Sequence, residues 1–205
     1  TVQGLPSAGI FVLPGKYQVS ISKNVNGELQ QLAGPEFFEI KELNNRSIPA
    51  LDRKELVSFK QKALELSYSI GAVSNELRSM GEKIPYYKAA VKALPSSESN
   101  ELFLEVIQLE QNLSTIQNSL NGDRDYATLD LDEMLSLRRR AGSAVYDIYN
   151  STSNIPGAVK KNFEIASEEY KLVLESFDAI KIAFDKLEAS LDEKNAPHTP
   201  GRMIK

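Results

Sequence analysis

One segment of the sequence carries side chains that could hold a metal ion. Oxygen-bearing residues recur at alternate positions from Asn121 through Asp123 to Asp125, as they do in calcium-binding loops. Tyr126 stands where such a loop needs glycine, and Asp132 stands at the twelfth position, which takes glutamate. A polar turn whose acidic residues favour the start of the next helix accounts for the same pattern. We therefore expect no resident metal, and Asp123 and Asp125 are the candidate ligands if one is held.

A run of three arginines and a pair of tyrosines are the remaining candidates for contacts. The guanidinium groups of Arg138–Arg140 could bind a phosphate or a carboxylate. Arg138 falls on the apolar stripe expected of its helix, so we expect it to be partly buried and paired with an acidic residue of the first or fourth helix. Tyr87 lies on the stripe of the first helix and is expected in the core, which leaves Tyr86 as a surface contact.

Composition argues against catalysis. The 205 residues include no Cys, no Trp and a single His, His198, which removes thiolate chemistry, cysteine-based zinc sites and histidine triads. Carboxylate pairs such as Glu168-Glu169 are expected on exposed helix faces, and no phosphate-binding loop or nucleophile elbow occurs. A net charge of −4 with interspersed signs disfavours nucleic acid as a partner, and no apolar run is long enough to span a membrane. We predict a chain that is not an enzyme and has no cofactor.

Residues 1–48 have the pattern of a small antiparallel β-element. Apolar and polar residues alternate over 17–22, which indicates a half-buried strand. Asn26-Gly27 is the preferred pair for a tight hairpin turn. Returning strands are predicted at 28–32 and again at 37–40. Because an isolated hairpin is marginal in water, we expect this element both to pack on the helices and to complete a sheet formed elsewhere.

Residues 49–194 have the pattern of four helices. Apolar residues recur at steps of three and four, and the pattern is interrupted at Pro95, Asn121-Gly122 and Pro156-Gly157. Pro85 falls inside the first stripe without changing its phase, so we expect one bent helix there. The third helix is expected to begin at Thr128 or Asp130. Its predicted stripe comprises Leu131, Met134, Arg138, Ala141, Val145 and Ile148.

These elements predict a mainly α protein, an elongated up-down-up-down four-helix bundle preceded by the β-element. Short connections favour antiparallel neighbours. The first and last helices are longer than the middle pair, so we expect them to overhang at the end where the β-element enters. The extended tail of residues 195–205 is expected to fold back near that same end.

The order of these landmarks resembles a known family. A strand opening with Leu-Pro-Gly-Lys-Tyr-Gln-Val at 13–19, a hairpin at 24–27 and a closing strand at 37–40 precede the helices, which end in Asn-Ala-Pro-His-Thr-Pro-Gly-Arg at 195–202. This arrangement resembles the C-terminal region of large bacterial BNR-repeat or sortilin-like glycosyl hydrolases, in which such a β-segment and a helical tail follow a β-propeller. The resemblance implies an exported protein of a Gram-negative bacterium of the Bacteroidetes type, located in the periplasm, on the cell surface or outside the cell.

Two departures limit what the resemblance implies. The sequence contains no Asp-box repeat of the form Ser-x-Asp-x-Gly-x-x-Trp, so the propeller and any site on it lie outside this chain. Glu-Leu-Asn-Asn at 42–45 stands where the family has an acidic-proline turn. No catalytic residue of the family maps onto this sequence.

We therefore expect a noncatalytic accessory module of a larger exported β-propeller protein. The chain opens at Thr1, and we expect it to be a piece of that longer polypeptide. Its expected partners are the upstream β-propeller or β-sandwich, a second copy or another protein. The alternative is a glycan- or protein-binding domain formed by the β-element and the end of the bundle. A third possibility is part of a glycoside hydrolase active unit.

Overall fold

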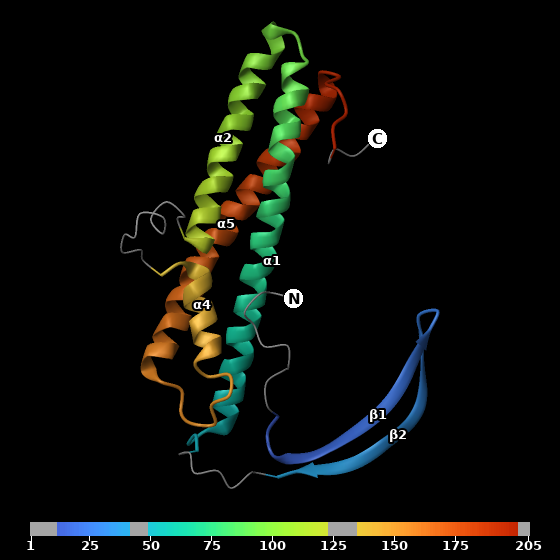
Figure 1. Cartoon of the computed structure of the whole chain (residues 1–205), viewed down its shortest axis with the longest axis vertical. Coiled ribbons are helices and arrows are strands. Elements are labelled where there is room, and N and C mark those ends of the chain that lie inside the picture. Colours follow the sequence, from blue (N-terminus) through green and yellow to red (C-terminus); the bar gives the residue numbers. More distant parts are fainter. Residues whose placement is uncertain (1–11, 42–48, 123–134, 201–205) are drawn as a thin grey trace.

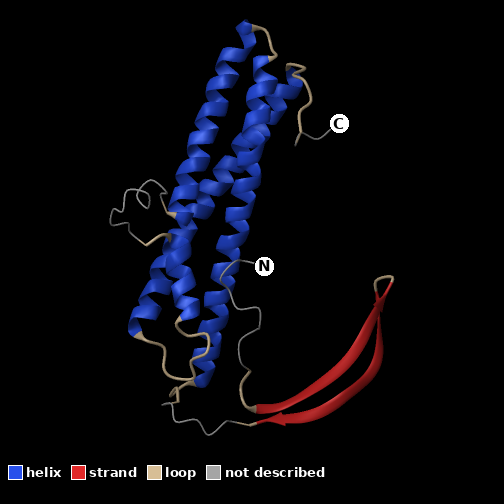
Figure 2. Ribbon diagram, in the orientation of Figure 1, coloured by secondary structure: helices blue, strands red, loops and turns tan. Residues whose placement is uncertain are grey.

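A computed structural model describes residues 12–41, 49–122 and 135–200. The elements in chain order are β1 (Gly15–Val25), β2 (Glu28–Ile40), α1 (Arg53–Lys92), α2 (Ser96–Asn121), α4 (Leu137–Tyr146) and α5 (Gly157–Glu193). The helices form an elongated bundle, and the two strands form an antiparallel hairpin that extends away from its lower end (Figures 1 and 2). The prediction of a mainly helical chain, with four packed helices after an N-terminal hairpin, is confirmed.

The longest helix begins at a side-chain cap and continues through a proline. The Asp52 carboxylate accepts a hydrogen bond from the Glu55 backbone amide at 3.0 Å, which satisfies one of the free amides of the first turn. Pro85 lies inside α1 without ending it, as the unchanged phase of the apolar stripe predicted. One face of α1 is therefore buried along the length of the bundle.

Most of the predicted stripe residues form one continuous core between α1, α2, α4 and α5. The side chains of Leu77, Val106, Leu120 and Leu191 are fully buried there. Removing such a side chain from water contributes about 1.5–3 kcal/mol. A smaller cluster of Ala144, Ile148 and Val159 lies against Phe59 and Phe163. Burial of these stripes is what holds the helices together.

The two long helices run parallel to each other. Near their beginnings, the rings of Phe59 on α1 and Phe163 on α5 meet with centroids 5.1 Å apart. Near their ends, the rings of Tyr87 and Phe184 meet at 5.6 Å. Both pairs occur in the same order along the chain, so α1 and α5 point the same way (Figure 1).

The two shorter helices lie one after the other along this pair. The Arg138 guanidinium at the start of α4 donates to the Asn121 side-chain oxygen at the end of α2, at 3.3 Å. Just beyond α4, the Tyr149 carbonyl accepts from Lys60 near the start of α1. Both α2 and α4 therefore run against α1, and α4 continues the course of α2 (Figure 1).

The predicted alternation of all four helices is therefore wrong for α2 and α4. Residues 122–136 separate these two helices, and a connection of that length does not force the tight reversal that we expected after Asn121-Gly122. The expected overhang is absent too, because α2 and then α4 cover the long pair from one end of α1 to the other.

The tail after α5 packs at the end of the bundle far from the hairpin. Asn195 has a positive φ of 50°, and the Ala196 amide donates to the Leu191 carbonyl at 2.9 Å. The Ala196 side chain is buried in the main core. The prediction that the tail folds back is confirmed for these residues, but its expected position beside the β-element is wrong, because α5 ends beside the end of α1.

Residues 135 and 136 are not helical, and α4 begins at Leu137, so the predicted third helix does not run unbroken from Met134 into Arg138. The Ser136 hydroxyl caps α4 by accepting from the Arg139 amide at 3.3 Å. Leu137 is buried where the prediction had Arg138, and Ala141, Val145 and Ile148 are buried as predicted. The predicted positions from Thr128 to Met134 lie outside the described residues.

Candidate interaction surface on the hairpin

A tight turn joins the two strands at the predicted place. Asn26 and Gly27 have φ values of 55° and 93°, the left-handed conformation that a two-residue hairpin turn needs. The Asn24 side-chain oxygen accepts from the Gly27 amide at 2.9 Å and holds the turn closed. The Asn26-Gly27 pair thus fixes the register of the hairpin.

The returning strand is continuous, whereas two separate strands were predicted. β2 passes through Gly34-Pro35, and the ladder is irregular between Val19 and Ser22 on the facing strand. Gly34 has a φ of 87°, and a Cβ placed on it would lie 2.5 Å from the Val19 carbonyl oxygen. Only glycine allows this close approach, so the residue read as a break is what keeps the strand paired through the bulge.

A tyrosine ties the start of the hairpin to the chain before it. The Tyr17 hydroxyl donates to the Leu13 carbonyl at 2.5 Å, and its ring lies 6.0 Å from that of Phe38 on the facing strand. The contact with Leu13 crosses from the strand back to the segment that leads into it. The sequence pattern identified the strand but gave no signal for this hydrogen bond.

One face of the hairpin is mostly apolar and open to solvent. Tyr17 is paired with Phe38 and Ile21 with Ala33, and paired residues of an antiparallel ladder point to the same side. Val19 lies between them on that side, because side chains alternate along a strand, and Glu36, its partner in the ladder, points to the same side. Val19, Ile21 and Phe38 are 52%, 59% and 47% exposed. We call Tyr17, Val19, Ile21, Ala33 and Phe38 the hairpin face.

No helix covers the hairpin face in the described part of the chain. The strands pack on each other, and no strand forms a substantial contact with a helix. The expected packing of the hairpin on the bundle is therefore wrong for residues 15–40. Contiguous exposed apolar surface is typical of interaction sites, which makes the hairpin face the strongest candidate site in the structure.

The chain between hairpin and bundle is fixed to the bundle just before α1. The Ala50 amide donates to the Thr152 carbonyl, and the Leu51 amide donates to the Asn154 side-chain oxygen, both at 2.8 Å. These contacts join residues that are about a hundred positions apart in the sequence. The place where the hairpin connection enters the bundle is thereby determined.

A buried lysine strengthens the same attachment. The Lys60 ammonium donates to the carbonyls of Tyr149 at 3.1 Å and Ser151 at 2.7 Å, which belong to the segment after α4. Burial lowers the pKa of Lys60 below its ordinary value. Sequence reasoning missed this residue, although Lys60 stands four positions after Leu56 and three before Ala63, which places it on the buried stripe.

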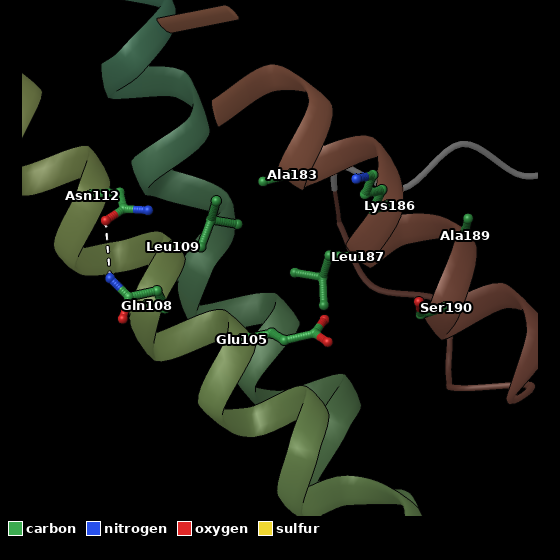
Figure 3. A pocket seen from close by; sticks show the side chains of 9 residues that line it. All are labelled: Glu105, Gln108, Leu109, Asn112, Ala183, Lys186, Leu187, Ala189 and Ser190. Atoms are coloured by element: carbon green, nitrogen blue, oxygen red, sulfur yellow. Dashed lines mark hydrogen bonds between the residues drawn. The ribbon is translucent and has the colours of Figure 1, made fainter. Parts of the chain in front are cut away.

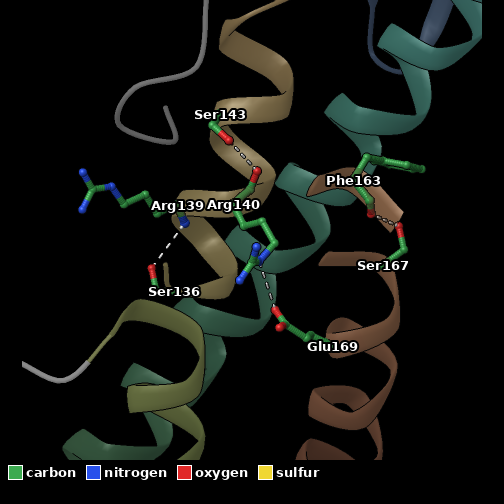
Figure 4. Close-up of polar contacts among 7 residues, drawn as sticks. All are labelled: Ser136, Arg139, Arg140, Ser143, Phe163, Ser167 and Glu169. Carbon is green, nitrogen blue, oxygen red and sulfur yellow. Dashed lines mark hydrogen bonds and ion pairs between the residues drawn. The ribbon is translucent and has the colours of Figure 1, made fainter. Parts of the chain in front are cut away.

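The arginine run makes a different ion pair from the predicted one. Arg138 is half-buried and bonds to the neutral amide of Asn121. It is Arg140 that reaches an acid on the last helix, with its Nε 3.7 Å from Glu169 (Figure 4). The predicted partner for Arg138 was wrong because the buried stripe of α4 passes through Leu137 and not through Arg138. Arg138 therefore lies beside the stripe, away from the acids of the first and last helices.

A groove lies between α2 and α5. Leu109, Ala183 and Leu187 line its apolar part, and Glu105 and Lys186 stand among its polar residues (Figure 3). Glu105 is the only carboxylate that lines it, so the groove lacks the paired acids that glycoside hydrolysis needs.

The remaining predicted residues are placed as follows. Tyr86 is exposed on α1, whereas Tyr87 is buried and its hydroxyl bonds to Glu188. His198 is exposed in the tail. Asp123 and Asp125 lie outside the described residues, and the described ones contain no group of three or more potential metal ligands. No helix among them is both long and apolar enough to cross a membrane.

Comparison with protein-family models, with curated proteins and with solved structures finds no significant match for this chain.

Proposed function

We propose that this chain is a noncatalytic structural module of a larger exported β-propeller protein. In this proposal the bundle is a spacer, and the hairpin face packs against the β-domain of the same polypeptide. The observation that carries the proposal is the exposure of Val19, Ile21 and Phe38 on strands that no helix of the described chain covers.

The bundle supports this division of roles. Its core is closed by its own helices, the groove between α2 and α5 holds no pair of acids, and the described residues contain no metal-binding cluster. The contacts of Ala50, Leu51 and Lys60 fix the point from which the hairpin leaves. These contacts give the segment before α1 a defined place on the bundle.

Thermal unfolding of the complete gene product tests the proposal. Ile21→Lys places a charge in the buried contact, so the midpoint of the β-domain transition should fall by about 4 °C or more. The matched control, Tyr86→Lys, changes an exposed position of the bundle and should leave that midpoint unchanged. An unchanged midpoint in Ile21→Lys would show that the hairpin face is not covered, and would end the proposal.

A second candidate function is glycan binding by the opposite face of the hairpin. Phe37 is 78% exposed there and is paired with Gln18, and an aromatic ring beside an amide is a combination that can bind a sugar. A glycan screen with the Phe37→Ala variant as control distinguishes the two candidates. Saturable binding that Phe37→Ala abolishes would favour the second.

A further inference from the structure

We propose that β1 and β2 are the last two strands of a Greek-key β-sandwich, with β1 inside a sheet and β2 at its edge. The strand that pairs with the free edge of β1 is then an acidic strand from the β-domain of the same polypeptide. This inference rests on the proposed function and adds to it which strand pairs, along which edge, and with what chemistry.

The hydrogen bond of Tyr17 is the first argument. In immunoglobulin-like Greek-key sandwiches, a tyrosine near the start of the second-last strand donates to a backbone carbonyl a few residues upstream. Tyr17 stands at the start of β1, and its hydroxyl donates to the Leu13 carbonyl four residues earlier. A tight hairpin then leads to β2. The contact and the hairpin together match the second-last and last strands of such a sandwich.

The two edges of the hairpin are the second argument. β2 contains Pro35, which has no amide hydrogen to give to a neighbouring strand, and the ladder is irregular where Pro35 lies. Proline and bulges within sheets are confined largely to edge strands, where they prevent further pairing. β1 contains no proline over Gly15–Val25. Its outer edge is therefore the one suited to accept another strand.

The two faces are the third argument. Tyr17, Val19 and Ile21 alternate with Gln18 and with serines at 20 and 22, so one face of β1 is apolar and the other is polar. In a β-sandwich the inward residues of each sheet pack against the second sheet, and the outward residues meet water. The hairpin face is therefore the inner surface, and a second sheet lies over it. Glu36, paired with Val19, points to the same side from β2, and an inward-pointing charge is typical of an edge strand.

Charge indicates the chemistry of the added strand. Lys16 and Lys23 are the charged residues of β1, whereas β2 carries Glu28, Glu36 and Glu39 and no base. Lys16 faces Glu39 in the ladder, but Lys23 faces the neutral Gln30. Opposite charges on paired strands are favourable and like charges are not. A strand bearing carboxylates therefore fits the β1 edge. The β1 strand of a second copy would bring lysines instead.

A second copy could offer only its acidic β2 strand to this edge. The inner edge of that strand is already paired with its own β1, and Pro35 and the bulge make its outer edge a poor partner for a further strand. A two-stranded hairpin is also marginal in water, and covalent linkage raises the effective concentration of the missing strands. The same polypeptide is therefore the source to which the proposal commits.

Thiol labelling tests which face is covered. The chain has no cysteine, so Val19→Cys on the apolar side and Gln18→Cys on the polar side each give a single thiol. In the native complete gene product, maleimide should label Val19→Cys at least about tenfold more slowly than Gln18→Cys, and denaturant should abolish the difference. Equal labelling of the two variants in the native protein would overturn the inference.

Hydrogen exchange tests which edge is paired. On each strand, the outward amides are the backbone N–H groups that point away from the other strand of the hairpin. Those of β1 should exchange slowly in the complete gene product, and those of β2 should exchange fast. Slow exchange in β2 and fast exchange in β1, together with slow maleimide labelling of Val19→Cys, would show that β2 is the inner strand. That result would overturn the inference and leave the proposed packing of the hairpin face intact. Protection that appears only as protein concentration and molecular mass rise together would identify a second copy as the occupant, and would also overturn the inference.

Charge reversal tests the chemistry of the added strand. Lys23→Glu in β1, opposite the neutral Gln30, should raise the exchange rate of the outward β1 amides, whereas the matched change Glu28→Lys in β2, opposite Val25, should not. An effect of Glu28→Lys equal to that of Lys23→Glu would contradict the acidic partner.

Discussion

The bundle and the hairpin use the same kinds of residue in opposite ways. In the bundle, Leu77 and Val106 are fully buried, because neighbouring helices supply partners on the side where their stripes lie. In the hairpin, Val19 and Ile21 form an equally regular pattern but remain more than half exposed. The periodic spacing of apolar residues thus indicates which side of a helix or strand is suited to burial. Whether the chain itself contains the covering element is a separate question.

The largest expected effect tests this contrast directly. Leu77→Ala removes a fully buried side chain and should lower the free energy of unfolding by about 2–5 kcal/mol. Ile21→Ala in the same 205-residue chain should change it by less than about 0.5 kcal/mol, since Ile21 is exposed there. Urea unfolding followed by circular dichroism measures both. Similar losses in the two variants would mean that the hairpin is part of the bundle's cooperative unit.

A smaller effect is expected within the hairpin itself. Gly34→Ala places a Cβ against the Val19 carbonyl at a positive φ, so the pairing of β1 with β2 around the bulge should be lost. Gly27→Ala also has a positive φ but meets no atom within 4 Å, so it should weaken the turn and keep more of the ladder. Cross-strand nuclear Overhauser effects report the pairing. A ladder that survives better in Gly34→Ala than in Gly27→Ala would contradict the register described here.

The smallest effect is expected at Lys60, and it depends on pH. Because burial lowers the pKa of Lys60 in the folded chain, the unfolded chain binds more protons between that lowered value and the ordinary value of 10.5. The contribution of Lys60 to stability therefore rises with pH through this window. The unfolding free energies of the wild-type chain and of Lys60→Met are measured from neutral pH towards pH 10.5. The value for the wild type should rise relative to that for Lys60→Met as the pH rises. A difference in unfolding free energy that stays constant with pH would show that burial does not shift the pKa of Lys60.

Local features of the fold could be predicted from the sequence. The Asn26-Gly27 turn, the continuity of α1 through Pro85 and the buried positions Ala141, Val145 and Ile148 follow from backbone preferences and helical spacing. Gly34-Pro35 was misread because glycine and proline mark breaks as often as bulges. Their role here depends on the Val19 carbonyl of another strand, which a local pattern does not reveal.

Features that depend on distant contacts could not be predicted in the same way. The place of Arg138 was wrong because the stripe fits either Arg138 or Leu137, and the Ser136 cap that decides between them was not recognised. The order of the helices depends on which ends meet, as Asn121 meets Arg138, and spacing within a helix carries no such information. The exposure of the hairpin face likewise depends on an element that the pattern of β1 and β2 does not contain.

The parallel course of α1 and α5 has a mechanical consequence. The chain runs along α1, returns through α2 and α4 and runs back along α5, so it enters and leaves the bundle at opposite ends. With 40 residues in α1, the two points lie on the order of 60 Å apart. Tension applied between the hairpin and the tail would therefore act along the axes of the two longest helices.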